Sequence, residues 1–146
     1  MRFWKDCVVI LYFDATGSLF VGPPGSKKRV FYYCMVLEGD AVIPPVASLE
    51  FITNGHSAFN IHQNLAVQVD ILRKLSPKKW PIVNIIETDF SKAMIQAACK
   101  AFNNWDLQVY LDKSFDKIIN PNLDIPLFTL IHVCATHLKR AAVKKI

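Results

Sequence analysis

The chain has 146 residues, 52% of them apolar, with 17 lysines and arginines against 12 aspartates and glutamates and a formal net charge of +5. This length suits one domain with a sizeable core, and no apolar run approaches the roughly 18 residues of a membrane-spanning helix. The first residues lead into an aspartate and a turn without a small-residue cleavage site, which argues against a signal peptide. We therefore predict a single domain over residues 1–146 with no membrane partner.

Four widely scattered cysteines, three of them inside apolar runs, favour buried reduced thiols in an intracellular protein over a disulfide framework. They are Cys7, Cys34, Cys99 and Cys134. The mean hydropathy of +0.24 is high for a small soluble domain. It favours a chain that stops short of its full fold over one that carries a partner surface.

The basic residues gather in short clusters at Lys27–Arg29, Lys78-Lys79, Lys139-Arg140 and Lys144-Lys145. Such clusters suit a polyanion such as nucleic acid. They are equally typical of solvated loops and helix ends, and a net charge of +5 does not decide between the two interpretations.

The first predicted strand is the apolar run Cys7–Phe13, which leads directly into Asp14. A turn at Thr16-Gly17 and a second short apolar run over residues 18–20 predict a hairpin partner. A carboxylate at the end of a central strand is held rigidly at an open sheet edge, where it can grip a divalent cation and leave sites for substrate. The alternative is an ordinary turn aspartate, since Asp favours turns through its own side-chain hydrogen bond.

The rest of the chain alternates between strand and helix patterns, without a repeat or a linker. Runs of β-branched and aromatic residues predict strands, and apolar residues at helical spacing predict helices. The predicted elements are strands at 30–37 and 46–53, a helix capped by Ser57 and stopped by Ser76-Pro77, a strand at 82–86, a helix from Ser91 to Phe102, a helix at 107–119, a strand at 127–133 and a basic helical tail at 138–146.

This order predicts an α/β fold with a mixed sheet, in which antiparallel strands come first and helices and strands then alternate. Asp14 follows the first strand, and Asp89 follows the strand at 82–86. In a ribonuclease H-like arrangement these two strands are parallel neighbours. Their carboxyl ends, and with them both carboxylates, then meet at one edge of the sheet.

Motifs along nearly the whole chain resemble, in the right order, the Mutator-like element (MULE) transposase domain and its relatives in animal genomes. They are Asp14–Phe20, Val30–Tyr33, Ile43–Ala47, Ile86–Met94, Lys100–Asn103, Tyr110-Leu111 and Ile131–Lys139. This family belongs to the DDE superfamily, so the resemblance implies a ribonuclease H-like core that cleaves DNA and transfers strands.

The resemblance further implies that Asp14 is the first and Asp89 the second metal-binding acid of a two-metal site for Mg²⁺ or Mn²⁺. One ion activates a water or a 3′-hydroxyl and the other stabilises the leaving oxygen. For Asp89 the alternative is a plain helix N-cap. DNA as the partner, a nuclear location and self-association as a homo-oligomer are further expectations from the resemblance.

The sequence departs from this family at its end. The family's third acid is a glutamate on a helix beyond the last strand, whereas residues 125–146 contain no Asp or Glu. Asp112 and Asp116 lie in the wrong predicted element, and the family's usual N-terminal zinc-binding module has no counterpart. We therefore expect either a fragment truncated before the last helix or a decayed or co-opted remnant, and leave enzymatic activity open.

A second constellation, His132, Cys134 and His137, lies where the last strand passes into the helical tail. The family carries a Cys-x-x-His near this place, and such ligands bind Zn²⁺. His137, expected as the first residue of the helix, is alternatively a phosphate contact. The third interpretation is a buried Cys134 with surface histidines.

Two hypotheses about function follow. The first is a metal-dependent, DNA-cutting transposase core with Asp14 and Asp89 as catalytic residues and nucleic-acid contacts from the basic tail. These contacts are Lys139, Arg140, Lys144 and Lys145. The second is a DNA- or protein-binding remnant of the same fold that has lost its chemistry.

Overall fold

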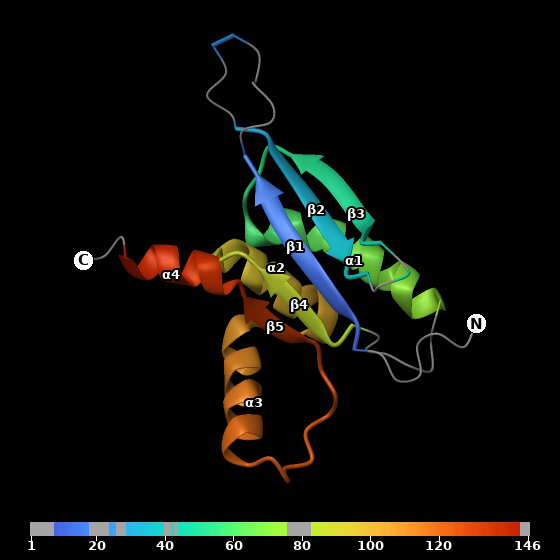
Figure 1. Ribbon diagram of the computed structural model, residues 1–146, viewed down its shortest axis with the longest axis vertical. Coiled ribbons are helices and arrows are strands. Elements are labelled where there is room, and N and C mark those ends of the chain that lie inside the picture. Colours follow the sequence, from blue (N-terminus) through green and yellow to red (C-terminus); the bar gives the residue numbers. More distant parts are fainter. Residues whose placement is uncertain are drawn as a thin grey trace.

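The computed structural model describes residues 8–17, 24–25, 29–39, 42, 44–75 and 83–143, and Figure 1 shows its elements. In chain order they are β1 (Ile10–Thr16), β2 (Phe31–Leu37), β3 (Val46–Thr53), α1 (Ala58–Leu75), β4 (Ile85–Thr88), α2 (Lys92–Asn103), α3 (Leu107–Ile119), β5 (Leu130–Val133) and α4 (Ala135–Val143). Within these described ranges, no helix is long and apolar enough to cross a membrane.

The described strands form one five-stranded mixed sheet in the order β3-β2-β1-β4-β5. β2 pairs antiparallel with both β1 and β3, whereas β1 pairs parallel with β4, and β4 parallel with β5. This confirms the α/β class and the prediction that the first strand and the strand before Asp89 are parallel neighbours. The arrangement is compatible with a ribonuclease H-like fold.

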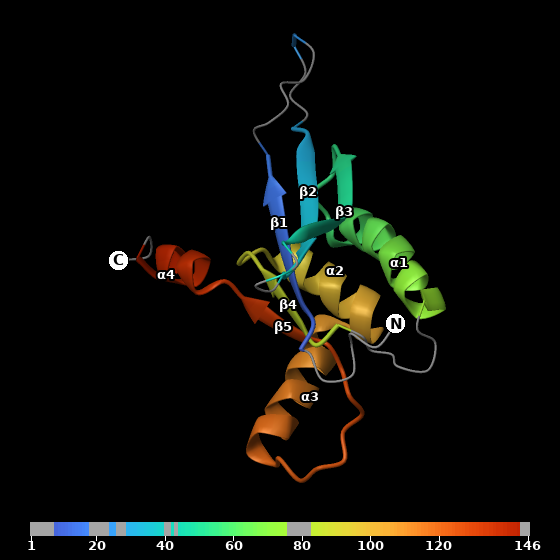
Figure 2. The ribbon, with the colours of Figure 1, turned by 45° about the vertical axis from the view of Figure 1, so that its right-hand side comes forward.

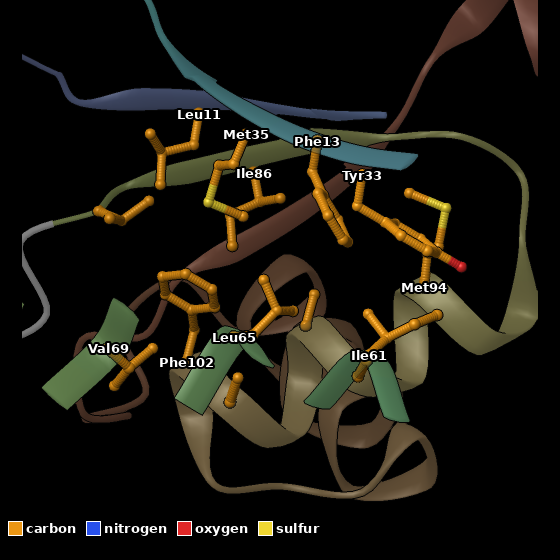
Figure 3. Close-up of a cluster of buried hydrophobic side chains, with 14 of the residues drawn as sticks. Leu11, Phe13, Tyr33, Met35, Ile61, Leu65, Val69, Ile86, Met94 and Phe102 are labelled. Carbon is orange, nitrogen blue, oxygen red and sulfur yellow. The ribbon is translucent and has the colours of Figure 1, made fainter. Parts of the chain in front are cut away.

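Helices α1 and α2 cover one face of the sheet and enclose the core (Figures 1, 2 and 3). Alternate side chains of β1, β2 and β4 point toward this layer because successive residues of a strand face opposite sides. The two helices contribute residues spaced about one turn apart to the same core. The buried residues of this core include Leu11, Phe13, Tyr33, Met35 and Ile86 from the sheet, Ile61, Leu65 and Val69 from α1, and Met94, Ala97, Ala98 and Phe102 from α2.

The opposite face of the sheet is largely open in the described part of the chain. A pocket of about 580 Å³ lies between this face and α3, with Ile10, Tyr12 and Leu130 in its lining. Tyr12 and Leu130 remain 38% and 47% exposed. This face of the sheet therefore leaves apolar side chains accessible to solvent, as a chain without its last helix is expected to do.

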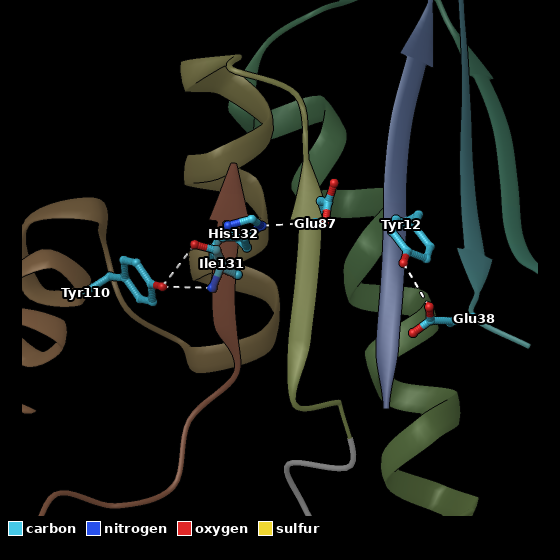
Figure 4. A network of polar contacts seen from close by, with 6 residues as sticks. All are labelled: Tyr12, Glu38, Glu87, Tyr110, Ile131 and His132. Atoms are coloured by element: carbon cyan, nitrogen blue, oxygen red, sulfur yellow. Dashed lines mark hydrogen bonds and ion pairs between the residues drawn. The ribbon is translucent and has the colours of Figure 1, made fainter. Parts of the chain in front are cut away.

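Polar contacts cross the open face, as Figure 4 shows. The Tyr12 hydroxyl donates to Glu38 Oε1 at 3.0 Å. Tyr110 of α3 holds the edge strand β5, because its hydroxyl accepts from the amide of Ile131 at 2.7 Å and donates to the carbonyl of the same residue at 3.3 Å. A single buried tyrosine thus fixes α3 against the last strand.

Several element limits differ from the sequence prediction. β1 continues to Thr16 because its pairing with β2 runs on to Thr16↔Tyr32 after the pairing with β4 has ended. β5 is shorter than predicted and starts at Leu130. Just before it, the amide of Thr129 donates to Asn103 Oδ1, and its hydroxyl donates to the carbonyl of Val83. Thr129 is therefore bonded to the last residue of α2 and to the segment that precedes β4.

The helical tail begins earlier than predicted, at Ala135, because the chain turns into α4 directly after β5. The predicted hairpin partner at residues 18–20 lies outside the described residues, and the antiparallel partner of β1 is β2. Of the four cysteines, Cys34, Cys99 and Cys134 are free; Cys99 is buried as predicted, whereas Cys34 and Cys134 are only partly buried. Cys7 lies outside the described ranges.

Leu65→Ala should lower the free energy of unfolding by about 2–5 kcal/mol, because it removes a fully buried side chain between α1 and the sheet. Val67→Ala is the matched control on the same helix, since Val67 is 61% exposed, and should change stability by less than about 0.5 kcal/mol. Urea unfolding measures both. Equal effects of the two substitutions would contradict the assignment of the core face of α1.

Candidate active site

The parallel pairing of β1 with β4 brings two acids to one edge of the sheet. The last parallel pair is Phe13↔Thr88, and the next residues on the two strands are Asp14 and Asp89. Both lie at the carboxyl ends of the parallel ladder, as the sequence predicted. Asp14 itself is still inside β1, opposite Cys34 of β2, so the alternative of a simple turn aspartate is wrong.

The two carboxyl groups are close enough to perturb each other. Asp89 is partly buried, and burial raises the pKa of its carboxyl group; a hydrogen bond with Asp14 and the negative charge of Asp14 raise that pKa further, while His137 lowers it. Asp14 is exposed, and its Oδ1 accepts a hydrogen bond from the amide of Ala15 at 2.7 Å. The structure therefore places two acids, one of which raises the pKa of the other, at an accessible edge of the sheet.

Asp89 does not cap α2, which corrects the second alternative from the sequence. The N-cap is Ser91, whose side chain accepts from the amide of Met94. The backbone amide of Ser91 bonds to the carbonyl of Asp89 at 2.7 Å. The carboxylate of Asp89 is thus free of the helix and turned to the sheet edge.

His137 reaches Asp89 from α4. The amide of Cys134 bonds to the carbonyl of Thr88 at 2.9 Å, so the start of α4 is fixed beside the end of β4. His137 is the third residue of α4 rather than its first, and its Nδ1 lies 2.7 Å from Oδ1 of Asp89. This contact has the distance of an ion pair without the alignment of a hydrogen bond.

The other members of the predicted zinc constellation lie elsewhere. Nδ1 of His132 is 3.5 Å from Oε2 of Glu87 on the open face of the sheet (Figure 4), and Cys134 is half-buried at the end of β5. The two histidines therefore contact different acids. Among the residues that the structure describes, no three or more His, Cys, Asp or Glu side chains form a metal-binding group, and the Zn²⁺ site stays a prediction.

A pocket of about 480 Å³ opens beside Asp89, between the end of β1, the start of β2, the β3–α1 loop, the start of α2, and α4. Its lining combines aromatic rings with groups that carry or can take charge. It includes Phe31, His56, Asp89, Phe90, His137 and Arg140. Asp89 thus lies in the wall of a cleft that can take a small ligand, since such sites typically measure about 300–1,000 Å³.

Sequence reasoning missed His56. Its ring contacts the Tyr33 hydroxyl through Nδ1, and its Nε2 lies 3.1 Å from Oγ of Ser91. The β3–α1 loop is therefore tied to the start of α2, two residues after Asp89. No local pattern signals this, because β3, α1 and α2 are separated along the chain and meet only in the folded sheet.

The basic clusters divide between described and undescribed residues. Lys139 and Arg140 are both exposed on α4, and Arg140 lines the pocket whereas Lys139 is absent from its lining. The other lysines of these clusters lie outside the described ranges; they are Lys27, Lys28, Lys78, Lys79, Lys144 and Lys145. The structure thus adds one basic residue, Arg140, to the surroundings of Asp89.

Comparison with known proteins gives one distant relative. The chain is 27% identical, over 117 residues, to the 120.7 kDa protein of the NOF-FB transposable element of Drosophila melanogaster, and the match covers 77% of this chain and 10% of that protein. No family model and no solved structure matches. The chain is therefore distantly similar to a protein encoded by a transposable element and spans about a tenth of its length.

Without metal, Asp89→Asn should stabilise the fold at neutral pH and lose this advantage in acid. A raised pKa means that the folded state holds the proton of Asp89 more tightly than the unfolded state, so ionising this group destabilises the fold above its folded-state pKa. As the pH falls through that pKa, the wild type becomes protonated and the difference closes. Urea unfolding from acidic to neutral pH measures it.

Asp124→Asn is the control, because Asp124 is exposed in the loop after α3. If the free energy of unfolding differed between wild type and Asp89→Asn by the same amount at every pH, the pKa of Asp89 would not be raised in the folded state.

Proposed function

We propose that the chain is part of the catalytic core of a Mutator-like, DDE-type transposase, a metal-dependent enzyme that cuts DNA and transfers strands. The observation that carries this proposal is the meeting of Asp14 and Asp89 at the carboxyl ends of parallel neighbours. The distant similarity to a transposable-element protein supports it. DNA as partner, a nuclear location and self-association go with this proposal and stay predictions.

The acid pair fits a hard divalent cation such as Mg²⁺ or Mn²⁺. Both groups offer carboxylate oxygens, which such ions prefer, and Asp14 is exposed, which leaves room for water and substrate phosphates. The raised pKa of Asp89 is also what a cation relieves, because positive charge favours the ionised carboxylate. Asp14 and Asp89 would hold the ions, which supply charge to the phosphate oxygens and an activated nucleophile.

The protein's own side chains prepare this edge. His137 holds the carboxylate of Asp89 from α4 and, when protonated, offsets its negative charge. Arg140 stands in the lining of the same pocket, where its guanidinium suits a phosphate of the DNA backbone. The contact between His56 and Ser91 ties the β3–α1 loop to the start of α2, the helix that follows Asp89.

A second candidate is a binding remnant of this fold without chemistry. It is favoured by one specific observation, that among the described residues no group of three or more His, Cys, Asp or Glu side chains is arranged to hold a metal ion. Two carboxylates leave the second ion short of a protein ligand. We therefore expect metal binding to survive better than DNA cleavage.

Millimolar Mn²⁺ or Mg²⁺ should raise the melting temperature by roughly 2–6 °C, because a ligand that binds only the folded state stabilises it by mass action. The rise should vanish in Asp14→Asn and in Asp89→Asn and persist in the exposed control Asp124→Asn. Thermal melts with and without metal measure this. A melt that metal leaves unchanged would mean that the two acids form no metal site.

The same variants are then tested for nicking of supercoiled plasmid, which should be absent or very weak in the wild type. Strong nicking that either Asp14→Asn or Asp89→Asn abolishes would show that a third acid is dispensable or comes from another molecule. The binding-remnant alternative would then be wrong.

A further inference from the structure

The pocket beside Asp89 has one wall made of rings whose positions are fixed from the core. Tyr33 is fully buried, and its ring stacks on that of Phe51, with centroids 4.7 Å apart. The Tyr33 hydroxyl contacts Nδ1 of His56, and the His56 ring lies 4.9 Å from that of Phe31 at an interplanar angle of 30°. Phe31 and His56 therefore stand in the pocket as a pre-organised surface.

Tyr33, His56 and Ser91 are joined by two successive polar contacts. Burial raises the pKa of Tyr33 to about 12, so at neutral pH its hydroxyl keeps its proton and can donate it to Nδ1 of His56. In the neutral imidazole the proton is then on Nε2, which donates to Oγ of Ser91 at 3.1 Å. Both nitrogens of His56 are engaged within the protein, and the exposed residue lines the pocket through its ring.

Phe90 supplies a second aromatic surface. It follows Asp89 directly, lines the same pocket and is 58% exposed. An exposed aromatic ring is unremarkable by itself. Here it shares a cleft with the rings of Phe31 and His56, with Arg140 and with Asp89. A ligand that uses all of these groups has a flat aromatic body joined to an anion.

We propose that this pocket binds one unpaired nucleotide of a DNA strand, with its base against Phe90 and the Phe31–His56 surface and its phosphate at Arg140. This inference rests on the proposed function for the identity of the nucleic acid. An unpaired base is required because bases within a duplex already stack on both faces, whereas a splayed base offers its π-face to aromatic side chains. The pocket would hold the strand beside Asp14 and Asp89.

Two fluorescent oligomers of about ten nucleotides test the base contact, since single-strand sites typically span roughly 4–16 nucleotides. One is oligothymidylate and the other has the same backbone without bases, so their charges are equal. By fluorescence anisotropy in EDTA, the wild type should bind oligothymidylate roughly 5- to 100-fold more tightly than the abasic strand. Equal affinities would overturn the proposal.

Phe90→Ala should remove most of this preference for bases. The matched control is Phe115→Ala, because Phe115 on α3 is 62% exposed and absent from the pocket lining. Circular-dichroism melts verify that both variants fold. If Phe90→Ala binds the two oligomers as the Phe115→Ala control does, no base stacks on Phe90 and the proposal is wrong.

Arg140→Gln should weaken both oligomers equally and reduce the dependence of binding on salt by about one phosphate contact, because it removes charge and no stacking surface. Lys139→Gln, one residue away and absent from the lining, should do less. Equal effects would place the phosphate outside the pocket. Tighter binding of oligouridylate than of oligothymidylate would overturn the assignment of DNA.

These measurements separate the pocket from the metal site. Binding in EDTA needs no cation, and Asp14→Asn should not weaken it, since that change only removes negative charge near the strand. If the protein prefers oligothymidylate but metal leaves its melting temperature unchanged, the nucleotide pocket stands and metal-dependent catalysis is refuted. If metal raises the melting temperature but the protein shows no preference for bases, the metal site stands and the nucleotide pocket is refuted.

Discussion

The parallel ladder between β1 and β4 fixes the position of both acids of the candidate site. It starts at Ile10↔Ile85 and ends at Phe13↔Thr88, and it is held from one side by the buried layer of Leu11, Phe13 and Ile86 against α1 and α2. A shift of one residue in this pairing would turn the core side chains to the open face. The same register that buries the core therefore also sets Asp14 beside Asp89.

The site is completed by segments that arrive from other parts of the fold. The Cys134 amide ties the start of α4 to the end of β4, which brings His137 to Asp89 and Arg140 to the pocket. On the other side, His56 joins the β3–α1 loop to Ser91. The repulsion between the two acids is thus maintained by surrounding contacts, which is the usual way in which functional sites hold perturbed groups.

Much of the fold follows from local patterns in the sequence. A continuous apolar run marks the first strand, with Leu11 and Phe13 in it, and helical spacing marks Ile61, Leu65 and Val69. All five residues face one continuous core. The parallel neighbours, and hence Asp14 and Asp89 at one edge, were predictable from the order of the elements. Limits set by tertiary pairing were not, as the extension of β1 to Thr16 shows.

The surroundings of the acids were predicted only in part. His137 was identified as a functional candidate, but its contact with Asp89 depends on how α4 leaves β5. A plain N-cap was an open alternative for Asp89, and the structure excludes it because the amide of Met94 bonds to Ser91. His56 and Phe90 carried no signal, because their meeting in one pocket arises from segments that are distant in the chain.

The central claim is that Asp14 and Asp89 act on each other at the sheet edge, and an NMR titration of the Asp89 carboxyl carbon tests it most directly. In the metal-free wild type, the pKa of Asp89 should lie above the ordinary range for aspartate. In Asp14→Asn it should fall, because the neighbouring negative charge is gone, while the contribution of burial remains. An Asp89 pKa that is the same in both proteins would contradict the account, since the two carboxylates would then not share a site.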